Sequence, residues 1–553
     1  MNARARARRL VWLRRGVQAA SLALFVTLLL AARPPAAGEP SGWLGLYFRI
    51  DPLVLIGNWL GGHPLAGLAL LALATVVLTV LLGRVFCGWL CPLGALHNAL
   101  SWLGARRPAR RRATDGFSRW QRAKYWLLAA LLVMALGGAH WGGVFDPQSL
   151  LYRSLVTGLL PALQWAVEAS SMGIYQADPH LGPLHLTALS EPLYRFWRDR
   201  VFAGQELVFA GGALILFVFV GLLLLNLLRP RFWCRYLCPL GALLGACAGR
   251  TALRLVPTGQ CGNCQRCLLS CPAAAQPEKP GQWLPEECFG CWNCVASCGE
   301  DALDFRWQPL WRRPVAARVD LGRRALVGAG LAGLGALLLF KLPPMARAKT
   351  FNPELIRPPG ALAEPDFLAR CVQCGLCMKA CPTGALQPAF DQAGLAGLWT
   401  PVLIPRLGYC EHGCALCGQV CPTGAIAPLA LTEKQALRIG LATLDTTRCL
   451  PYAYGRECIV CEEHCPVPTK AIYFVETEVQ LRGGERRVLK QPRVDAALCT
   501  GCGICETKCP FADRAAIRVT SANESRHPAN QPLLPGALPL GGGNSLGADP
   551  YGG

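Results

Sequence analysis

The spacing of the cysteines constrains this 553-residue chain more than any other feature. In six places four cysteines end in Cys-x2-Cys-x3-Cys, the spacing with which a tight loop gives three thiolates to one [4Fe-4S] cluster and the fourth to a neighbouring cluster. The groups with regular spacing throughout are Cys261, Cys264, Cys267 and Cys271; Cys288, Cys291, Cys294 and Cys298; Cys371, Cys374, Cys377 and Cys381; and Cys499, Cys502, Cys505 and Cys509. Two groups have a longer first spacing: Cys410, Cys414, Cys417 and Cys421, and Cys449, Cys458, Cys461 and Cys465.

Other uses of so many cysteines fit this pattern less well. Zinc ribbons also contain Cys-x2-Cys pairs, but zinc takes four ligands per site and rarely uses a three-plus-one loop. Disulfide frameworks belong to short secreted domains, and this chain is long. We therefore expect about six [4Fe-4S] clusters, whose natural use is stepwise electron hopping.

The loop pattern also predicts which groups share clusters. In the first two groups, one cluster takes Cys261, Cys264, Cys267 and Cys298, and the other takes Cys288, Cys291, Cys294 and Cys271. Among the later four groups the two regular ones are outermost, which favours a nested arrangement over sequential pairing. The nested sets are Cys371, Cys374, Cys377 and Cys509; Cys499, Cys502, Cys505 and Cys381; Cys410, Cys414, Cys417 and Cys465; and Cys449, Cys458, Cys461 and Cys421.

Five apolar stretches indicate a membrane domain. They cover residues 16–32, 64–83, 125–139, 207–228 and 325–340, and the longer ones suffice to cross a bilayer. For the shorter ones, a buried helix of a soluble domain is the alternative. The predicted fold class is an α-helical membrane domain of about four spans plus a fifth linking span, with α+β ferredoxin-like domains on both sides.

Arginines beside the apolar stretches predict the orientation. Positive charge marks the cytoplasmic ends of membrane spans, so the formal charge of +21 does not point to nucleic acid. We expect the N-terminus and residues 261–298 to be cytoplasmic and residues after about 345 to be periplasmic, in a bacterial inner membrane. The arginines are Arg4, Arg6, Arg8, Arg9, Arg14 and Arg15; Arg106, Arg107, Arg110, Arg111 and Arg112; Arg229, Arg231 and Arg235; and Arg312, Arg313, Arg323 and Arg324.

These features divide the chain into six segments. The segment 306–348 is either a basic segment with an anchoring span or an internal twin-arginine-like export signal, since Arg323 and Arg324 precede an apolar run and Ala346-Arg347-Ala348 follows it. Cleavage after Ala348 stays open. The segments are a membrane domain (1–250), a two-cluster ferredoxin domain (251–305), the basic segment (306–348), a Pro-rich linker (349–366), a four-cluster ferredoxin-like domain (367–520) and a disordered tail (521–553).

A repeat inside the membrane domain carries four further cysteines. RVFCGWLCPLGAL from Arg84 matches RFWCRYLCPLGAL from Arg231 at nine of thirteen positions, and each is preceded by an Asp-Pro loop at Asp51 or Asp146. If each Cys-x3-Cys pair lies on a helix, its thiols share a face, so four sulfurs could converge. A metal centre, a redox-active dithiol and inert helix-end cysteines are the alternatives for Cys87, Cys91, Cys234 and Cys238. Cys247 is expected to be a small buried apolar residue.

With these motifs in hand, the chain resembles a fusion of two proteins of periplasmic nitrate reductase systems. Residues 1–305, with the two repeats and the groups 261–298, are similar to the membrane quinol dehydrogenase subunit of NapH type and its methylamine-utilisation relative. Residues 320–520, with the twin arginine and four cysteine groups, are similar to the exported ferredoxin-type partner of NapG type. Neither haem nor flavin is predicted, because no Cys-x-x-Cys-His or convincing flavin motif is present.

This resemblance implies a quinol dehydrogenase, or electron-transfer subunit, that passes electrons to a periplasmic c-type cytochrome or terminal reductase. The alternative is a redox assembly or maintenance factor for a periplasmic metalloenzyme. Asp51 and Asp146, expected in outward loops, are candidate acceptors of the quinol protons, although Asp-Pro is also a common turn starter. Two clusters inside and four outside would leave about 30 Å of hydrocarbon to cross.

Overall fold

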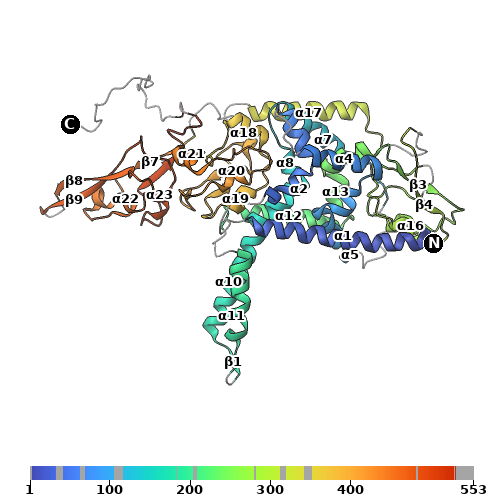
Figure 1. Ribbon diagram of the computed structural model, residues 1–553, viewed down its shortest axis with the longest axis horizontal. Helices are drawn as coiled ribbons and strands as arrows, with labels where there is room; N and C mark the ends of the chain where they lie inside the picture. The colour runs from blue at the N-terminus through green and yellow to red at the C-terminus, as the bar shows by residue number, and fades with distance from the viewer. Residues whose placement is uncertain are drawn as a thin grey trace.

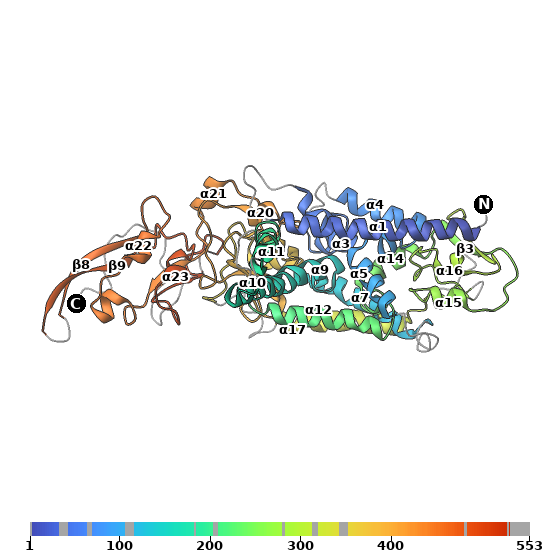
Figure 2. The ribbon, with the colours of Figure 1, turned by 90° about the horizontal axis from the view of Figure 1, so that it is seen from below.

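Helices form the middle of this elongated molecule, and small units of short helices and strand pairs lie at its two ends (Figure 1). The computed structural model describes residues 3–32, 42–62, 69–104, 116–181, 184–202, 208–278, 282–311, 319–341, 352–480, 484–527 and 530. Residues 251–305 lie at one end beside the N-terminus, and residues 352–530 lie at the other (Figures 1 and 2). The predicted basic loop 106–112, Arg312, Arg313, Ala348 and most of the tail lie outside the described residues.

Two helices are long and apolar enough to cross a membrane by length and composition: α1 (Ala3–Ala31) and, within α17 (Arg323–Lys341), residues Arg323–Phe340. The second, third and fourth predicted spans are the helices α4 (Ala69–Leu82), α7 (Ala123–Leu136) and α12 (Gly212–Leu224). These three have 14, 14 and 13 residues. At 1.5 Å per residue each is only about 20 Å long, so among the described residues two of the five predicted spans have spanning length.

Short helices enter the helical domain between the long ones. The turn between α2 (Leu46–Arg49) and α3 (Pro52–Leu60) reaches the middle of α1 and α4. There Thr75 Oγ1 donates to Ile50 O at 2.9 Å, and the hydroxyls of Ser21 and Tyr47 lie 2.8 Å apart. The second repeat places α8 (Gly142–Phe145) and α9 (Pro147–Ser154) in the equivalent position.

The sequence predicted that the two Asp-Pro turns lie in outward loops. The structure instead places them inside the helical domain. Asp51 and Asp146 are 1% and 0% exposed, and their carboxylates cap α3 and α9 by accepting from Leu53 N and Ser149 N. Proline at the first helical position fixes the backbone after each cap. The turns point inward because the polar groups at the helix starts find partners there, as in the broken helices of membrane proteins.

The remaining helices complete the domain. The helix α17 packs along α7, where a Cβ at Gly333 would lie 2.5 Å from Ala130 O. A pair of helices, α10 and α11, projects away from the body (Figure 1). The other elements here are α5 (Pro92–Gly104), α10 (Leu160–Ala177), β1 (His180–Leu181), β2 (Leu184–His185), α11 (Leu186–Phe196), α13 (Phe232–Tyr236) and α14 (Pro239–Ala248).

The end units consist of antiparallel strand pairs and short helices that follow the cysteine loops. The N-terminal side has β3 (Leu253–Pro257) paired with β4 (Leu303–Trp307), α15 (Arg266–Ser270) and α16 (Asn293–Ser297). In the C-terminal unit β5 (Leu386–Pro388) pairs with β6 (Pro401–Leu403), β7 (Leu441–Leu444) with β10 (Ile517–Thr520), and β8 (Ile472–Gln480) with β9 (Arg486–Val494). Its helices are α18 (Glu364–Arg370), α19 (Leu376–Ala380), α20 (Leu416–Gln419), α21 (Leu431–Ala436), α22 (Val460–Glu463) and α23 (Ile504–Lys508).

The described part of the predicted linker, residues 352–366, packs into the C-terminal unit instead of running free. Arg357 is 1% exposed and pairs with Glu364 at 2.5 Å. Arg526, from the predicted tail, donates to the other Glu364 oxygen at 2.7 Å. Composition marked the first segment as a linker and the second as disordered, but this buried ion network holds residues 352–366 and Arg526 in the unit.

Replacing Glu364 by Gln should destabilise the C-terminal unit by about 3 kcal/mol, because Arg357 would stay buried without its counter-charge. Burial by itself raises the pKa of Glu364, but Arg357 and Arg526 hold it down at about 2, below its ordinary value of 4.5. The contribution of this carboxylate to the free energy of unfolding is complete above its ordinary pKa. It is lost as the pH falls toward 2. Thermal unfolding should therefore show the same deficit at pH 6 and pH 8. The exposed Glu354→Gln is the control, and equal stability of the two variants would contradict the prediction.

Candidate metal centres

Two sets of four cysteines lie beside the β3–β4 pair. Cys298 joins Cys261, Cys264 and Cys267 around one cavity. Cys271 joins the group at 288–294 around a second cavity. The structure thus brings together the same two sets that the loop pattern predicts, with the fourth cysteine of each loop crossing to the other. Cys261 and Cys264 are exposed, whereas the second cavity is lined by buried or half-buried cysteines.

The C-terminal unit pairs its groups in sequence, so the nested arrangement predicted from the sequence is not the one observed. Cys381 lines a cavity with Cys410, Cys414 and Cys417, and Cys509 lines one with Cys449, Cys458 and Cys461. The two reciprocal sets are indicated by electrostatic interactions, of Cys421 with Cys371, Cys374 and Cys377, and of Cys465 with Cys499 and Cys502. Sequential pairing closes shorter loops than nested pairing and therefore costs less chain entropy.

The four C-terminal sets follow one another along the unit. Val372 O lies at the helical domain, next to Gly143, so the set of Cys371 comes first. Cys410 N donates to Cys502 O at 2.8 Å, which joins the second set to the third. Cys505 interacts electrostatically with Cys461, which joins the third set to the fourth. The long β8–β9 hairpin lies at the far end (Figure 1).

These donor sets fit [4Fe-4S] clusters. Backbone amides point at ligand sulfurs, as around clusters: Ala302 N donates to Cys298 Sγ at 3.3 Å and Ala516 N to Cys509 Sγ at 3.4 Å. Among the described residues, no three or more His, Cys, Asp or Glu are grouped so as to hold a single metal ion. The cysteines instead surround small cavities from several sides. A cluster bound there would supply reversible one-electron transfer.

The two Cys-x3-Cys-Pro pairs meet in the helical domain. All four cysteines are buried, and Cys238 interacts electrostatically with Cys87, Cys91 and Cys234. The repeat forms the same local structure twice, because Cys91 and Cys238 each precede the proline that begins a helix, α5 or α14. Their sulfurs accept from the amides three residues later, at 3.3 and 3.2 Å. We call Cys87, Cys91, Cys234 and Cys238 the four-thiol site.

The four-thiol site borders the loop of the Cys271 set. A Cβ at Gly88 would lie 2.3 Å from Phe289 O, so only glycine lets these two loops meet. Arg84 and Arg231 both lie over the Phe289 ring, with guanidinium carbons 4.9 and 4.6 Å from its centre. Both guanidinium groups are buried, and they lie near cysteines of the four-thiol site and of the Cys271 set. Arg84 is balanced by Glu287 at 3.5 Å.

On its other side the four-thiol site is linked to the C-terminal unit. Gln148 Nε2 lies 3.6 Å from Cys91 Sγ, and Asp146, two residues earlier, interacts electrostatically with Asp51. Arg153 Nη1 donates to Gln373 O at 2.8 Å, between Cys371 and Cys374. Sequence reasoning missed Gln148 and Arg153. The signal available in the sequence was an arginine, Arg153, within a mostly apolar stretch.

Comparison with known families assigns three parts of the chain. Residues 64–111 and 212–253 match a 4Fe-4S binding domain, and this match contains both Cys-x3-Cys-Pro pairs. Residues 370–425 match a 4Fe-4S dicluster domain, and residues 492–512 match a 4Fe-4S binding domain. The dicluster match covers the two groups that the structure pairs first in the C-terminal unit.

Among curated proteins, the methylamine utilization ferredoxin-type protein MauM of Paracoccus denitrificans is 41% identical over 210 residues, which are 38% of this chain and 88% of MauM. The chain belongs to the MauM/NapG family of ferredoxin-type proteins. NapG of Escherichia coli is 36% identical over 212 residues, 37% of this chain and 87% of NapG. NapH of E. coli is 27% identical over 272 residues, 46% of this chain and 75% of NapH.

These relatives confirm the resemblance drawn from the motifs, a NapG-like and a NapH-like part fused in one chain. No solved structure matches the chain. The family matches support several [4Fe-4S] clusters and an iron–sulfur electron-transfer protein.

Cys421→Ser and Cys374→Ser should perturb the same EPR signal, because the two cysteines belong to one set, whereas Cys509→Ser should perturb the signal that Cys458→Ser perturbs. The measurement is low-temperature EPR of the dithionite-reduced full chain, with iron content as the check on cluster loss. Cys247→Ser, outside all sets, is the control. If Cys374→Ser and Cys509→Ser changed one signal together, the nested pairing would be restored.

Proposed function

We propose that the chain is a membrane-bound quinol dehydrogenase that takes electrons at its N-terminal side and passes them through the cysteine sets to an acceptor at its C-terminal side. The N-terminus and residues 251–305 face the cytoplasm, and the C-terminal unit faces the periplasm of a bacterial inner membrane. The acceptor is a c-type cytochrome or a terminal reductase.

The observation that carries this proposal is an unbroken series of contacts between the cysteine sets at the two ends of the helical domain. It runs from the Cys271 set through Phe289 and Gly88 to the four-thiol site. It continues through Gln148 to the buried aspartates, and then through Arg153 to the loop of Cys374. A centre between the two ends shortens the electron steps, whereas the hydrocarbon thickness of about 30 Å is too long for one.

Exposed apolar surface supports the membrane location. Leu70 on α4, Phe217 on α12 and Leu331 on α17 are 73%, 77% and 63% exposed, on helices whose other faces pack inside the domain. Contiguous exposed apolar surface of this kind is unfavourable in water and suits a bilayer. The packing of α17 on α7 favours an anchoring helix over a removed export signal, and the tilt of longer helices or local bilayer thinning would accommodate the short ones.

For the four-thiol site we propose a metal-type centre that receives electrons from the Cys271 set. The 4Fe-4S binding-domain match over both Cys-x3-Cys-Pro pairs favours this over a dithiol. Arg84, Arg231 and Lys124 stand near the thiols, and their positive charge stabilises thiolates in a buried place. Amides at Gly94 and Gly241 hold two of the sulfurs by hydrogen bonds.

Addition of a menaquinol analogue to the anaerobic full chain tests the function. The EPR signals of reduced [4Fe-4S] clusters should develop within the turnover time of a periplasmic acceptor. Clusters that dithionite reduces but quinol leaves oxidised would instead favour a redox assembly or maintenance factor. Iron and labile sulfide analysis of the same sample, expected at about 24 iron atoms for six clusters, checks that the chain is loaded.

Cys91→Ser and Cys238→Ser should divide the electron path in two. Quinol should still reduce the two clusters held by residues 261–298, but reduction of the four C-terminal clusters should slow at least about tenfold, since the middle centre is impaired. Rapid-freeze EPR after quinol addition separates the two groups of signals. Cys247→Ser should behave as wild type. Unchanged reduction of the C-terminal clusters in both variants would remove the four-thiol site from the path.

A further inference from the structure

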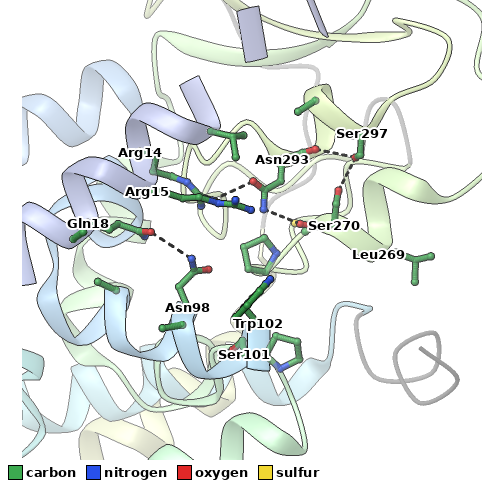
Figure 3. Close-up of a pocket in the computed structure, with 18 of the residues that line it drawn as sticks. Arg14, Arg15, Gln18, Asn98, Ser101, Trp102, Leu269, Ser270, Asn293 and Ser297 are labelled. Carbon is green, nitrogen blue, oxygen red and sulfur yellow. Dashed lines mark hydrogen bonds between the residues drawn. The ribbon is translucent and has the colours of Figure 1, made fainter. Parts of the chain in front are cut away.

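A cavity of about 690 Å³ lies where α1 and α5 meet the loops that end α15 and begin α16 (Figure 3). Its size is in the range that holds a small organic ligand, and ligand sites of this size are mostly apolar with a few placed polar groups. The lining has that character. One wall is Val11, Ala19 and Leu22 of α1, with Ala95 and Ala99 of α5.

The inner end of the cavity is polar and belongs to the two-cluster unit. Asn293 and Ser297 of α16 and Ser270 of α15 face it (Figure 3). Asn293 Nδ2 donates to Ser270 O at 3.2 Å, and the hydroxyls of Ser270 and Ser297 lie 2.8 Å apart. Gln18 and Asn98 add a second polar pair, with Asn98 Nδ2 donating to Gln18 Oε1 at 3.4 Å. These groups can donate to or accept from two ring oxygens.

Arg14 gives the cavity a buried cation. Its side chain is 2% exposed, and it donates from Nη2 to Asn293 Oδ1 at 3.2 Å. Its Nε and Nη1 atoms have no hydrogen-bond partner and are shielded from solvent. Buried guanidinium nitrogens normally find an acceptor, since leaving them unpaired costs free energy. A ligand oxygen in this cavity would supply one.

The same end of the cavity is formed by Cys271 and Pro272. Cys271 belongs to the set that borders Gly88 and the four-thiol site, and Arg14 interacts electrostatically with Cys291 of that set. A redox ligand in the cavity would therefore touch a cysteine of the first set on the path. At the other end Arg15 and Trp102 are exposed, which leaves an opening to solvent and headgroups.

We propose that this cavity binds the head group of the quinol, with its isoprenoid tail along Val11, Ala19 and Leu22. The inference rests on the proposed function and places its substrate site at the side opposite to Asp51 and Asp146, which do not line the cavity. Oxidation of one quinol to quinone breaks two O–H bonds and releases two protons and two electrons. The electrons leave one at a time to oxidised [4Fe-4S] clusters, starting at the Cys271 set, and the protons leave to water at the open mouth.

A phospholipid is the other amphipathic occupant that a cationic cavity could take. Its phosphate would be bound by Arg14 or Arg15. The phospholipid would then make no use of the neutral hydrogen-bonding groups of Asn293, Ser270 and Asn98. The position of the polar groups around Cys271 favours a planar head group with two oxygens over a phosphate.

The test uses the loaded full chain in detergent and an azido-quinone photolabel, with Ala19→Trp as the blocking variant. Ala19 and the adjacent Ala20 are both exposed, but Ala19 lines the cavity and Ala20 does not, so Ala20→Trp is the matched control. In wild type and Ala20→Trp the label should attach to peptides containing residues 11–22 or 95–102, and Ala19→Trp should raise the label's Kd at least about tenfold. Quinol reduction of the clusters should slow in the same variant, while reduction by dithionite should not.

The outcomes separate this site from the function itself. Labelling near Asp51 and Asp146, or unchanged quinol reduction in Ala19→Trp, would overturn the cavity and leave the quinol dehydrogenase standing. Co-purified phospholipid that competes with the label in wild type, with no effect of Ala19→Trp on reduction, would assign the cavity to a lipid. A wild-type chain that neither binds the label nor is reduced by quinol would overturn both proposals. Arg14→Leu, with label binding as its readout, should weaken binding without loss of iron.

Discussion

Two buried carboxyl groups that interact electrostatically lie at the centre of this molecule. Asp51 and Asp146 each cap a short helix that begins with proline, and they meet because the two repeats face each other. Burial and like charge both disfavour ionisation of the two carboxyl groups together. The cap that Asp146 forms fixes the start of α9, which brings Gln148 to Cys91 on one side and Arg153 to Gln373 on the other.

Arg153 then joins the helical domain to the C-terminal unit. It is fully buried, lies 4.3 Å from the centre of the Trp399 ring, and donates to Gln373 O and Val144 O. Cation–π contact and two carbonyl acceptors offset the desolvation of a guanidinium that would otherwise not be tolerated there. The close approach of Gly143 to Val372 O completes the contact. This interface places the first C-terminal cysteine set against α8 and α9, and Gln148 of α9 lies beside Cys91 of the four-thiol site.

The sequence was sufficient for what depends on local spacing and insufficient for what depends on packing. Cys261 to Cys298 fold back on themselves within one short unit, and the predicted sets are those the structure brings together. The longer separations between 371 and 509 allowed two pairings. The nested one was favoured because the two regular groups are outermost, although the loop-closure cost favours the sequential one. Asp51 and Asp146 were identified as equivalent positions of the repeat but placed in outward loops, because inward-pointing turns leave no pattern in hydropathy. Residues 349–366 were taken as a linker from their prolines, although Arg357 and Glu364 within them form a buried ion pair.

The fusion of the two parts has a physical consequence at the Arg153 interface. For separate proteins, that contact must offset the loss of translational and rotational freedom on association. In one chain the C-terminal unit stays at a high effective concentration near the helices, so the contact forms without that loss. The same linkage fixes a ratio of one between the part that would take electrons and the part that would deliver them. Contacts between the cysteine sets then depend on folding alone, without a separate binding step.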